Sequence, residues 1–194
     1  VVPAKRPADA VPYRLPDRCP VCGAEVVRDE DGAALRCTGA ECPAQLLRNL
    51  THFASRNAMD IDGLGPAVIQ QLVDSGLVRT AADLYSLRPE QIAELDRMGQ
   101  KSARNAVEAI ARSREDDLWR LIFALGIRQV GEKAAKVLAA RFGSMDALST
   151  ATEEELTAID DVGPITAKYI RQWMDSPQSQ DLLARLKAAG LNMT

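Results

Sequence analysis

Aromatic residues are scarce in this chain, where Phe, Trp and Tyr together make up 4% of 194 residues. Alanine and leucine are abundant instead, and this mixture favours helices over strands. No apolar run approaches the roughly 20 residues needed to cross a bilayer, and no charged-then-apolar signal sequence opens the chain. Because 46% of the residues are apolar, a core can form. We therefore expect a soluble, cytoplasmic, mainly α-helical protein with no membrane partner.

The chain also lacks an excess of positive charge. It has 24 Lys and Arg residues against 27 Asp and Glu residues, which gives a net charge of −3 and a pI of about 5.3. This balance argues against binding of nucleic acid by overall electrostatic attraction. Any such contact must therefore come from local basic clusters and from backbone donors.

Cysteine is absent beyond residue 42, and the four cysteines form two pairs: Cys19-x2-Cys22, then fourteen residues, then Cys37-x4-Cys42. Two disulfides are an alternative, but a cytosolic protein keeps its thiols reduced, and paired knuckles are typical of a metal site. Four thiolates hold one zinc ion tetrahedrally and leave no open position, so the site is predicted to be structural. The single histidine, His52, is not expected to be a ligand.

Proline and turn residues indicate the organisation of the chain. Prolines crowd the first 18 residues, which predicts an extended segment, and the turn signal Asp31-Gly32 predicts a small β-hairpin between the cysteine pairs. We expect a linker over 1–15, a four-cysteine zinc finger over 16–50 and an all-α domain over 51–194. The chain begins with Val rather than Met, so we expect a segment of a longer protein.

The helical part contains an internal repeat of four short glycine turns, each opening a helix. We name them hairpins one to four, and they span residues 61–65, 95–99, 127–131 and 159–163. Their final glycines stand 34, 32 and 32 residues apart. Each turn has an apolar residue four positions before its last glycine and another directly before it. The repeat unit is therefore helix, tight turn, helix, and the all-α domain is predicted to hold four helix-hairpin-helix motifs.

Turns of this kind can bind the phosphates of a nucleic-acid backbone. The helix that follows each turn offers unpaired N–H groups and the positive end of its dipole, which together bind phosphate without reading base sequence. The candidate DNA-binding residues are the turn glycines and the nearby cations: Gly63, Gly65, Arg97, Gly99, Lys101, Arg104, Arg128, Gly131, Lys133, Lys136, Gly163, Lys168 and Arg171.

Hairpins two and three are expected to contribute most of the DNA affinity. Each has two cations just past the turn and a residue with a free N–H at the first helical position, where hairpins one and four have Pro66 and Pro164. The alternative is that the glycines only end helices in an all-α bundle. Four of them at nearly equal spacing, each opening a helix, favour the binding interpretation.

An ordered set of motifs resembles the bacterial NAD-dependent DNA ligases. It comprises Cys19-Pro-Val-Cys-Gly, His52-Phe-Ala-Ser-Arg, Met59-Asp-Ile-Asp-Gly-Leu-Gly, Met98-Gly-Gln-Lys-Ser-Ala and Ala124-Leu-Gly-Ile-Arg-Gln-Val-Gly. The resemblance runs in order from about residue 12 to residue 192. The chain departs from the helix-hairpin-helix pattern at Arg97, Gln129 and Asp161, which stand where hairpin one has Gly63.

This resemblance implies that the chain is one part of a longer enzyme and that other domains of that enzyme carry out catalysis. In that family, an NAD-binding domain, an adenylation domain with a Lys-x-Asp-Gly nucleophile and an oligonucleotide-binding barrel precede the finger, and a BRCT domain follows. No Lys-x-Asp-Gly occurs here, so this chain is expected to be non-catalytic by itself. The resemblance implies zinc in this chain, with NAD and magnesium only in the parent enzyme, and a monomer that grips nicked duplex DNA through the minor groove.

Two other functions remain open on the residues alone. One is a helix-hairpin-helix module of another repair protein, and the other is a scaffold that binds only protein. An independent enzyme is least favoured, because the sequence shows no Ser/His/Asp set, open metal site or nucleotide-binding loop.

Overall fold

The computed structural model describes residues 6–7, 9–11, 14–28, 34–37 and 42–194. The chain divides into two compact units, Val1–Ala44 and Gln45–Thr194, which are described separately below. The finer division that the sequence suggested, at residues 15/16 and 50/51, remains a prediction.

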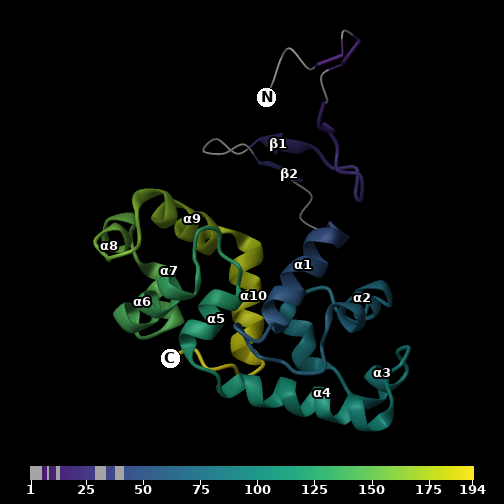
Figure 1. The fold of residues 1–194 in the computed structure, drawn as a ribbon. Coiled ribbons are helices and arrows are strands. Elements are labelled where there is room, and N and C mark those ends of the chain that lie inside the picture. Colours follow the sequence, from purple (N-terminus) through teal and green to yellow (C-terminus); the bar gives the residue numbers. More distant parts are fainter. Residues whose placement is uncertain (1–5, 8, 12–13, 29–33, 38–41) are drawn as a thin grey trace. The chain divides into compact units, whose positions relative to one another are not determined.

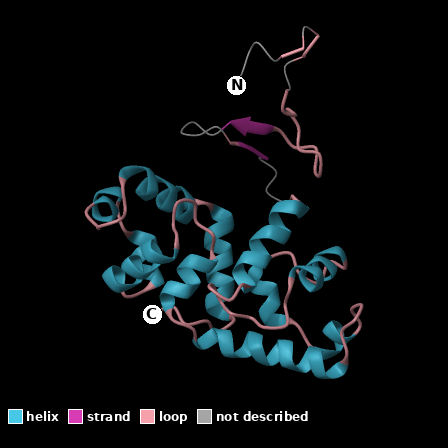
Figure 2. Ribbon diagram, in the orientation of Figure 1, coloured by secondary structure: helices cyan, strands magenta, loops and turns pink. Residues whose placement is uncertain are grey.

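The first unit holds a two-stranded antiparallel sheet, β1 (Val26–Arg28) and β2 (Leu35–Cys37), drawn as arrows in Figure 2. Val26 pairs with Cys37 and Arg28 with Leu35, which is the hairpin expected between the two cysteine pairs. The expected turn at Asp31-Gly32 lies outside the described residues.

The second unit is built from helices, and Figure 1 shows their order along the chain. The α-helices are α1 (Pro43–Ala54), α2 (Pro66–Asp74), α3 (Pro89–Ala93), α4 (Gln100–Arg112), α5 (Leu118–Ala124), α6 (Glu132–Phe142), α7 (Met145–Thr150), α8 (Glu153–Thr157), α9 (Pro164–Asp175) and α10 (Pro177–Ala188). Short 3-10 helices span Ala81–Ser86 and Ser113–Glu115. The expected fold class, mainly α with a small hairpin, is confirmed.

Several helix ends follow from local chemistry. Thr152 and Glu155 form a capping box at the start of α8: Glu155 N–H donates to the Thr152 hydroxyl, and Thr152 N–H donates to the Glu155 carboxylate. Gly143, at φ 67°, ends α6 in the left-handed conformation that glycine adopts without a steric penalty. Across the described residues, none of the helices combines the length and apolar character that a membrane span requires.

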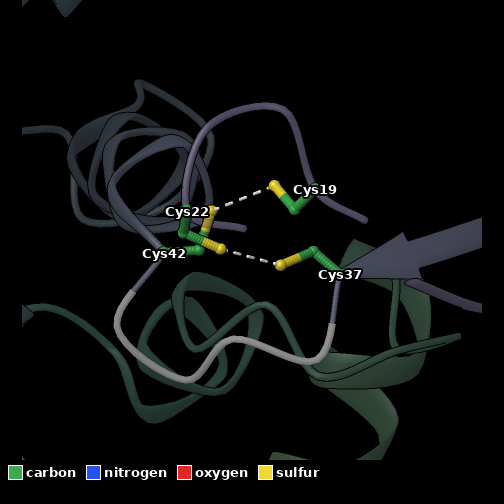
Figure 3. A group of neighbouring side chains, drawn as sticks. All are labelled: Cys19, Cys22, Cys37 and Cys42. Carbon is green, nitrogen blue, oxygen red and sulfur yellow. Dashed lines mark hydrogen bonds between the residues drawn. The ribbon is translucent and has the colours of Figure 1, made fainter. Parts of the chain in front are cut away.

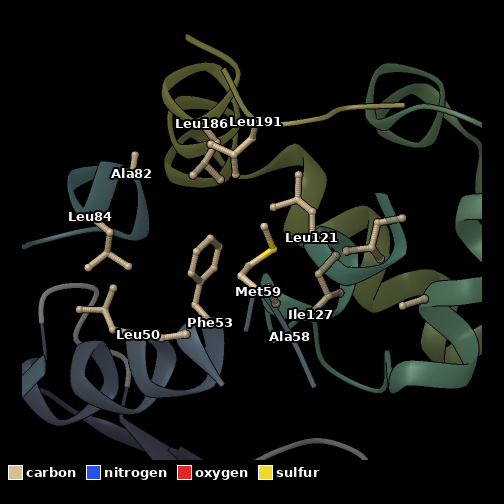
Figure 4. Close-up of a cluster of buried hydrophobic side chains, with 14 of the residues drawn as sticks. Leu50, Phe53, Ala58, Met59, Ala82, Leu84, Leu121, Ile127, Leu186 and Leu191 are labelled. Carbon is tan, nitrogen blue, oxygen red and sulfur yellow. The ribbon is translucent and has the colours of Figure 1, made fainter. Parts of the chain in front are cut away.

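One hydrophobic cluster joins the two halves of the helical unit. Figure 4 shows Phe53 of α1 near Met59, with Leu121 of α5 and Leu186 of α10 in the same cluster. These side chains are at most 2% exposed, and burial of each stabilises the fold by roughly 1.5–3 kcal/mol. Because the same core supports all four hairpins, each turn is held on a rigid base.

Candidate metal centre and nucleic-acid interface

The four cysteines converge in the first unit. The Sγ atoms of Cys19, Cys22, Cys37 and Cys42 all lie within 4.8 Å of one another. Figure 3 marks two of the sulfur pairs: the Cys19 and Cys42 sulfurs are 3.9 Å apart, and those of Cys22 and Cys37 are 3.3 Å apart. All four are free thiols, at distances far above the roughly 2.05 Å of a disulfide bond.

The local backbone explains why these sulfurs meet. Gly23 adopts φ 71°, and its N–H donates to the Cys19 carbonyl at 2.9 Å, which folds the first pair into a tight knuckle. Cys19 N–H in turn donates to the Ala24 carbonyl at 2.8 Å. Cys37 ends strand β2, and Cys42 directly precedes helix α1. The strand and the helix therefore each deliver one sulfur to the knuckle.

The donor set fits a tetrahedral zinc ion. Zinc–sulfur bonds of about 2.3 Å in a tetrahedron place the sulfurs about 3.8 Å apart, close to the separations found here. Backbone N–H groups of Cys22 and Val21 hydrogen-bond the Cys19 sulfur and lower the pKa of that thiol to about 6. The pKa of Cys22 is raised to about 12, because the lowering effect of the Ala24 backbone is outweighed by the neighbouring thiols and by burial. Of these two thiols, Cys19 is therefore the more readily deprotonated for metal binding. His52 lies elsewhere: its Nε2 is 2.8 Å from the Phe123 carbonyl oxygen in the helical unit.

The four hairpins have the same backbone geometry. In each, the residue before the last glycine donates its N–H to the carbonyl three positions earlier, at 3.0–3.4 Å. The last glycine is the N-cap of the next helix, and its carbonyl accepts from the residue four positions on. The four acceptors of this second bond are Gly65, Gly99, Gly131 and Gly163, which cap α2, α4, α6 and α9. The predicted repeat is therefore a repeat of structure.

The third residue of every turn adopts a left-handed backbone conformation, whatever its residue type. Gly63 has φ 86°, while Arg97, Gln129 and Asp161 have φ of 62°, 63° and 69°. The departures from glycine noted in the sequence thus leave the turn unchanged in shape. Arg97, Gln129 and Asp161 are strained in this conformation, since left-handed φ is unfavourable by roughly 1–2 kcal/mol for residues with a Cβ.

The backbone conformation of the last glycine in each hairpin does not explain why this residue is glycine. Gly65, Gly99, Gly131 and Gly163 have φ between −70° and −97°, which any residue adopts. A Cβ added at any of them would meet nothing within 4 Å. Neither strain nor packing within the chain therefore requires glycine at these four positions. The space beside each one is open, at the start of a helix.

Hairpin two presents unpaired cations. Arg97, Lys101 and Arg104 are exposed, and within the described part of the chain none of their side chains forms an ion pair or a hydrogen bond. Lys101 lies at the second position of α4 and Arg104 one turn further on. Their charges stand beside the open space at Gly99.

The cations of hairpin three are already engaged. Lys133 Nζ is 2.9 Å from Asp161 Oδ1, and Lys136 Nζ is 2.6 Å from Glu132 Oε1 on the same helix. Lys136 also lies over the Trp119 ring, 4.4 Å from its centroid. The sequence did not indicate the ion pair between Lys133 and Asp161, because it joins residues 28 positions apart.

Arg171 of hairpin four is held by contacts within the chain. Its guanidinium donates to the carbonyls of Ser149 and Ala151 at 2.7 and 3.0 Å and pairs with Asp175. Its side chain is only 18% exposed. Arg171 therefore binds the carbonyls at the end of α7 within the chain, and its part in DNA binding stays a prediction. Lys168 is exposed on the same helix.

Three protein-family models match successive parts of the chain. Residues 18–44 match the NAD-dependent DNA ligase C4 zinc finger domain. Residues 55–112 match the SAM-like helix-hairpin-helix tandem family, and 120–183 match the helix-hairpin-helix motif family. The chain is thus a four-cysteine zinc finger followed by tandem helix-hairpin-helix motifs.

Curated relatives extend the match over the whole chain. A DNA ligase of Marinobacter nauticus is 55% identical over 98% of the chain, and one of Symbiobacterium thermophilum is 54% identical over 100%. A DNA ligase of Levilactobacillus brevis is 51% identical over 100%. The chain spans 28–29% of the length of these relatives. Over almost its whole length the chain is therefore similar to one segment of these DNA ligases, and its cysteine module matches the zinc finger of the NAD-dependent ones.

Proposed function

We propose that this chain is the DNA-binding portion of an NAD-dependent DNA ligase, gripping the backbone of duplex DNA around a nick. The observation that carries the proposal is the set of four last glycines. Each stands at a helix start where this chain itself does not require glycine. An outside backbone that approaches closely would require it, because a methyl group at that position would hold the backbone away.

The chemistry of the hairpins suits phosphate. At each helix start, N–H groups without helical partners and the positive end of the dipole favour an anion. Four such sites on one rigid core bind through phosphates and sugars, which gives affinity without base readout. This mode needs few net positive charges, and so it is compatible with a chain of net charge −3.

The wider roles rest on the motif resemblance described above and are part of the proposal. The grip is through the minor groove, and the partners are nicked duplex DNA and the catalytic domains of the same polypeptide. Those domains, with NAD and magnesium, would seal the nick during replication and repair. This chain contributes binding and no catalytic step, since the sequence has no Lys-x-Asp-Gly nucleophile. We expect it to act as a monomer.

The finger is proposed to hold one structural zinc ion. Cys19, Cys22, Cys37 and Cys42 would supply the four ligands. A closed four-sulfur site has no position for substrate, so the metal would stabilise the finger and take no part in the ligation chemistry.

The test is alanine substitution of Gly99 and of Gly131. Each variant should be as stable as the parent or up to about 1 kcal/mol more stable, because φ is compatible and alanine has less entropy to lose. Affinity for a nicked duplex should nevertheless fall by about five- to tenfold per substitution, as a charge-assisted contact is lost. Fluorescence titration and thermal unfolding measure the two effects.

Gly76→Ala is the matched control. Gly76 has φ 73° and lies outside the hairpins, so this change should lower stability and leave DNA affinity unaltered. Parental affinity in Gly99→Ala and Gly131→Ala would contradict the phosphate role. A parent chain that shows no salt-dependent binding to DNA would instead favour a scaffold that binds only protein.

A further inference from the structure

Two contacts join hairpin three to hairpin four. Lys133, at the second position of α6, forms an ion pair of 2.9 Å with Asp161, the left-handed residue of hairpin four. Arg128, in the turn of hairpin three, lies over the ring of Tyr169 on α9, 4.2 Å from the centroid. Both contacts bring a cation of hairpin three against a residue of the fourth motif.

Hairpin four is poorly equipped to bind phosphate itself. Pro164 at the first helical position has no N–H to donate, and the next position holds Ile165, which is 51% exposed, where hairpins two and three have lysine. Arg171 is committed to the carbonyls of α7. Two carboxylates, Asp160 and Asp161, stand in the turn. The turn of hairpin four thus places negative charge against Lys133 of hairpin three, while the exposed cation of the fourth motif, Lys168, lies further along α9.

We propose that Asp161 is an intramolecular counter-ion that occupies Lys133 in the absence of DNA and that a DNA phosphate must displace. This inference rests on the proposed DNA-binding function. Asp161 then limits the affinity of hairpin three, and binding there is an exchange of one anion for another. Hairpin two, whose Lys101 has no such partner among the described residues, binds phosphate without this exchange.

The exposure of the pair makes the exchange feasible. The Lys133 side chain is 79% exposed and that of Asp161 is 41% exposed. Surface ion pairs of this kind are weak and are screened by salt. A phosphate held also by the N–H groups of α6 can therefore replace the carboxylate. The displaced carboxylate remains nearby and repels the phosphate, so its charge reduces affinity both before and after binding.

The experiment removes the charge of Asp161 and keeps its shape. Asparagine is isosteric and is the residue, after glycine, that best tolerates φ near 69°, so Asp161→Asn should leave the turn intact. Asp160→Asn is the matched control, because it removes an equal charge one residue away that no described cation pairs with. Lys133→Ala and the double variant Lys133→Ala/Asp161→Asn complete a cycle. The probe is a nicked duplex titrated at several salt concentrations with each 194-residue chain.

Asp161→Asn is expected to bind the nicked duplex about two- to fivefold more tightly than the parent. Its salt dependence should be steeper by about one counterion, because one more lysine charge is available to phosphate. Asp160→Asn should show a clearly smaller gain. In the Lys133→Ala background, the gain from Asp161→Asn should also shrink, since the lysine that it releases is gone. Thermal unfolding of each variant verifies that the fold is kept.

Three results would overturn the inference while leaving the proposed function in place. They are equal gains from the two asparagine variants, an unchanged gain in the Lys133→Ala background, and weaker binding by Asp161→Asn. If the parent chain and every variant fail to bind DNA, the proposed function fails, and the inference fails with it.

Discussion

Four different residue types adopt the same left-handed backbone conformation at the third position of the hairpin turns. Gly63, Arg97, Gln129 and Asp161 all have positive φ, although only glycine adopts it without a steric penalty. The three other residues are held there by the turn hydrogen bond and by apolar residues on either side, which are buried at hairpins three and four and partly buried at hairpin two. At hairpin three these are Ile127 and Val130, which are 3% and 6% exposed. Packing therefore fixes φ at these sites against the local preference.

Replacing Gln129 by glycine is expected to raise the free energy of unfolding. Gln129 is exposed, so the substitution relieves left-handed strain and removes no burial. The net gain should be about 0.5–1 kcal/mol, because the relief of strain exceeds the extra entropy of glycine in the unfolded chain. Denaturant unfolding of the isolated chain measures it.

Gln100→Gly is the control in the same fold. Gln100 is the first residue of α4 and follows a glycine with negative φ, so glycine there should lower stability by up to about 1 kcal/mol. Destabilisation by Gln129→Gly would show that the left-handed position carries no strain.

At the scale of elements, the folded finger depends on its four cysteine sulfurs for stability, whereas the helices do not. Among the described residues of the first unit, only Cys19 and Cys42 are buried, and each strand has three residues. So small a set of apolar contacts cannot offset the entropy of ordering the segment. The helical unit has its own core and does not face this problem.

Removal of the metal or of one ligand should therefore unfold the finger selectively. We expect about one zinc per chain in elemental analysis and a loss of the β-hairpin in Cys37→Ser or after treatment with a strong chelator. The helices beyond residue 55 should keep their circular dichroism and their unfolding midpoint. Less than about half an equivalent of metal, or a finger that stays folded in chelator, would contradict the prediction.

At the scale of the whole molecule, one core joins the two helix-hairpin-helix halves. Arg114 donates from Nε to the Ala189 carbonyl at 2.9 Å and from its terminal nitrogen to the Tyr85 carbonyl at 3.1 Å. Asn192 N–H donates to the Arg114 carbonyl at 2.7 Å. These bonds tie the end of the chain to its first half. The hairpins are therefore presented as a rigid set rather than on separate arms.

This arrangement predicts a difference between hairpins two and three. The double variant Lys101→Ala/Arg104→Ala should weaken binding to a nicked duplex by about five- to twentyfold. It should also flatten the salt dependence by nearly two units. Lys133→Ala/Lys136→Ala should lose less, because Asp161 and Glu132 already neutralise these lysines.

The control uses cations at the other end of the same helices. Arg112 and Arg141 lie in the last turns of α4 and α6, so their alanine variants should bind as the parent does. Equal losses from the two hairpin variants would show that the intramolecular ion pairs do not matter for binding.

The sequence by itself determined the four hairpin turns and the cysteine cluster. The helix starts at Gly65, Gly99, Gly131 and Gly163 follow from turns of five residues, and the finger follows from two short cysteine pairs. The turn contacts close within a few positions. The cysteines lie up to 23 positions apart, but two short cysteine pairs are a spacing typical of a shared metal site, so the pattern still indicated that they converge.

Only the tertiary structure decided how the cations are used. Lys133 and Arg171 look alike in the sequence, as basic residues just past a glycine turn. Yet Lys133 meets Asp161 at the surface, and Arg171 binds the carbonyls of Ser149 and Ala151. These partners stand 20 to 28 positions away. Their approach depends on how helices pack through the core, which no local pattern encodes.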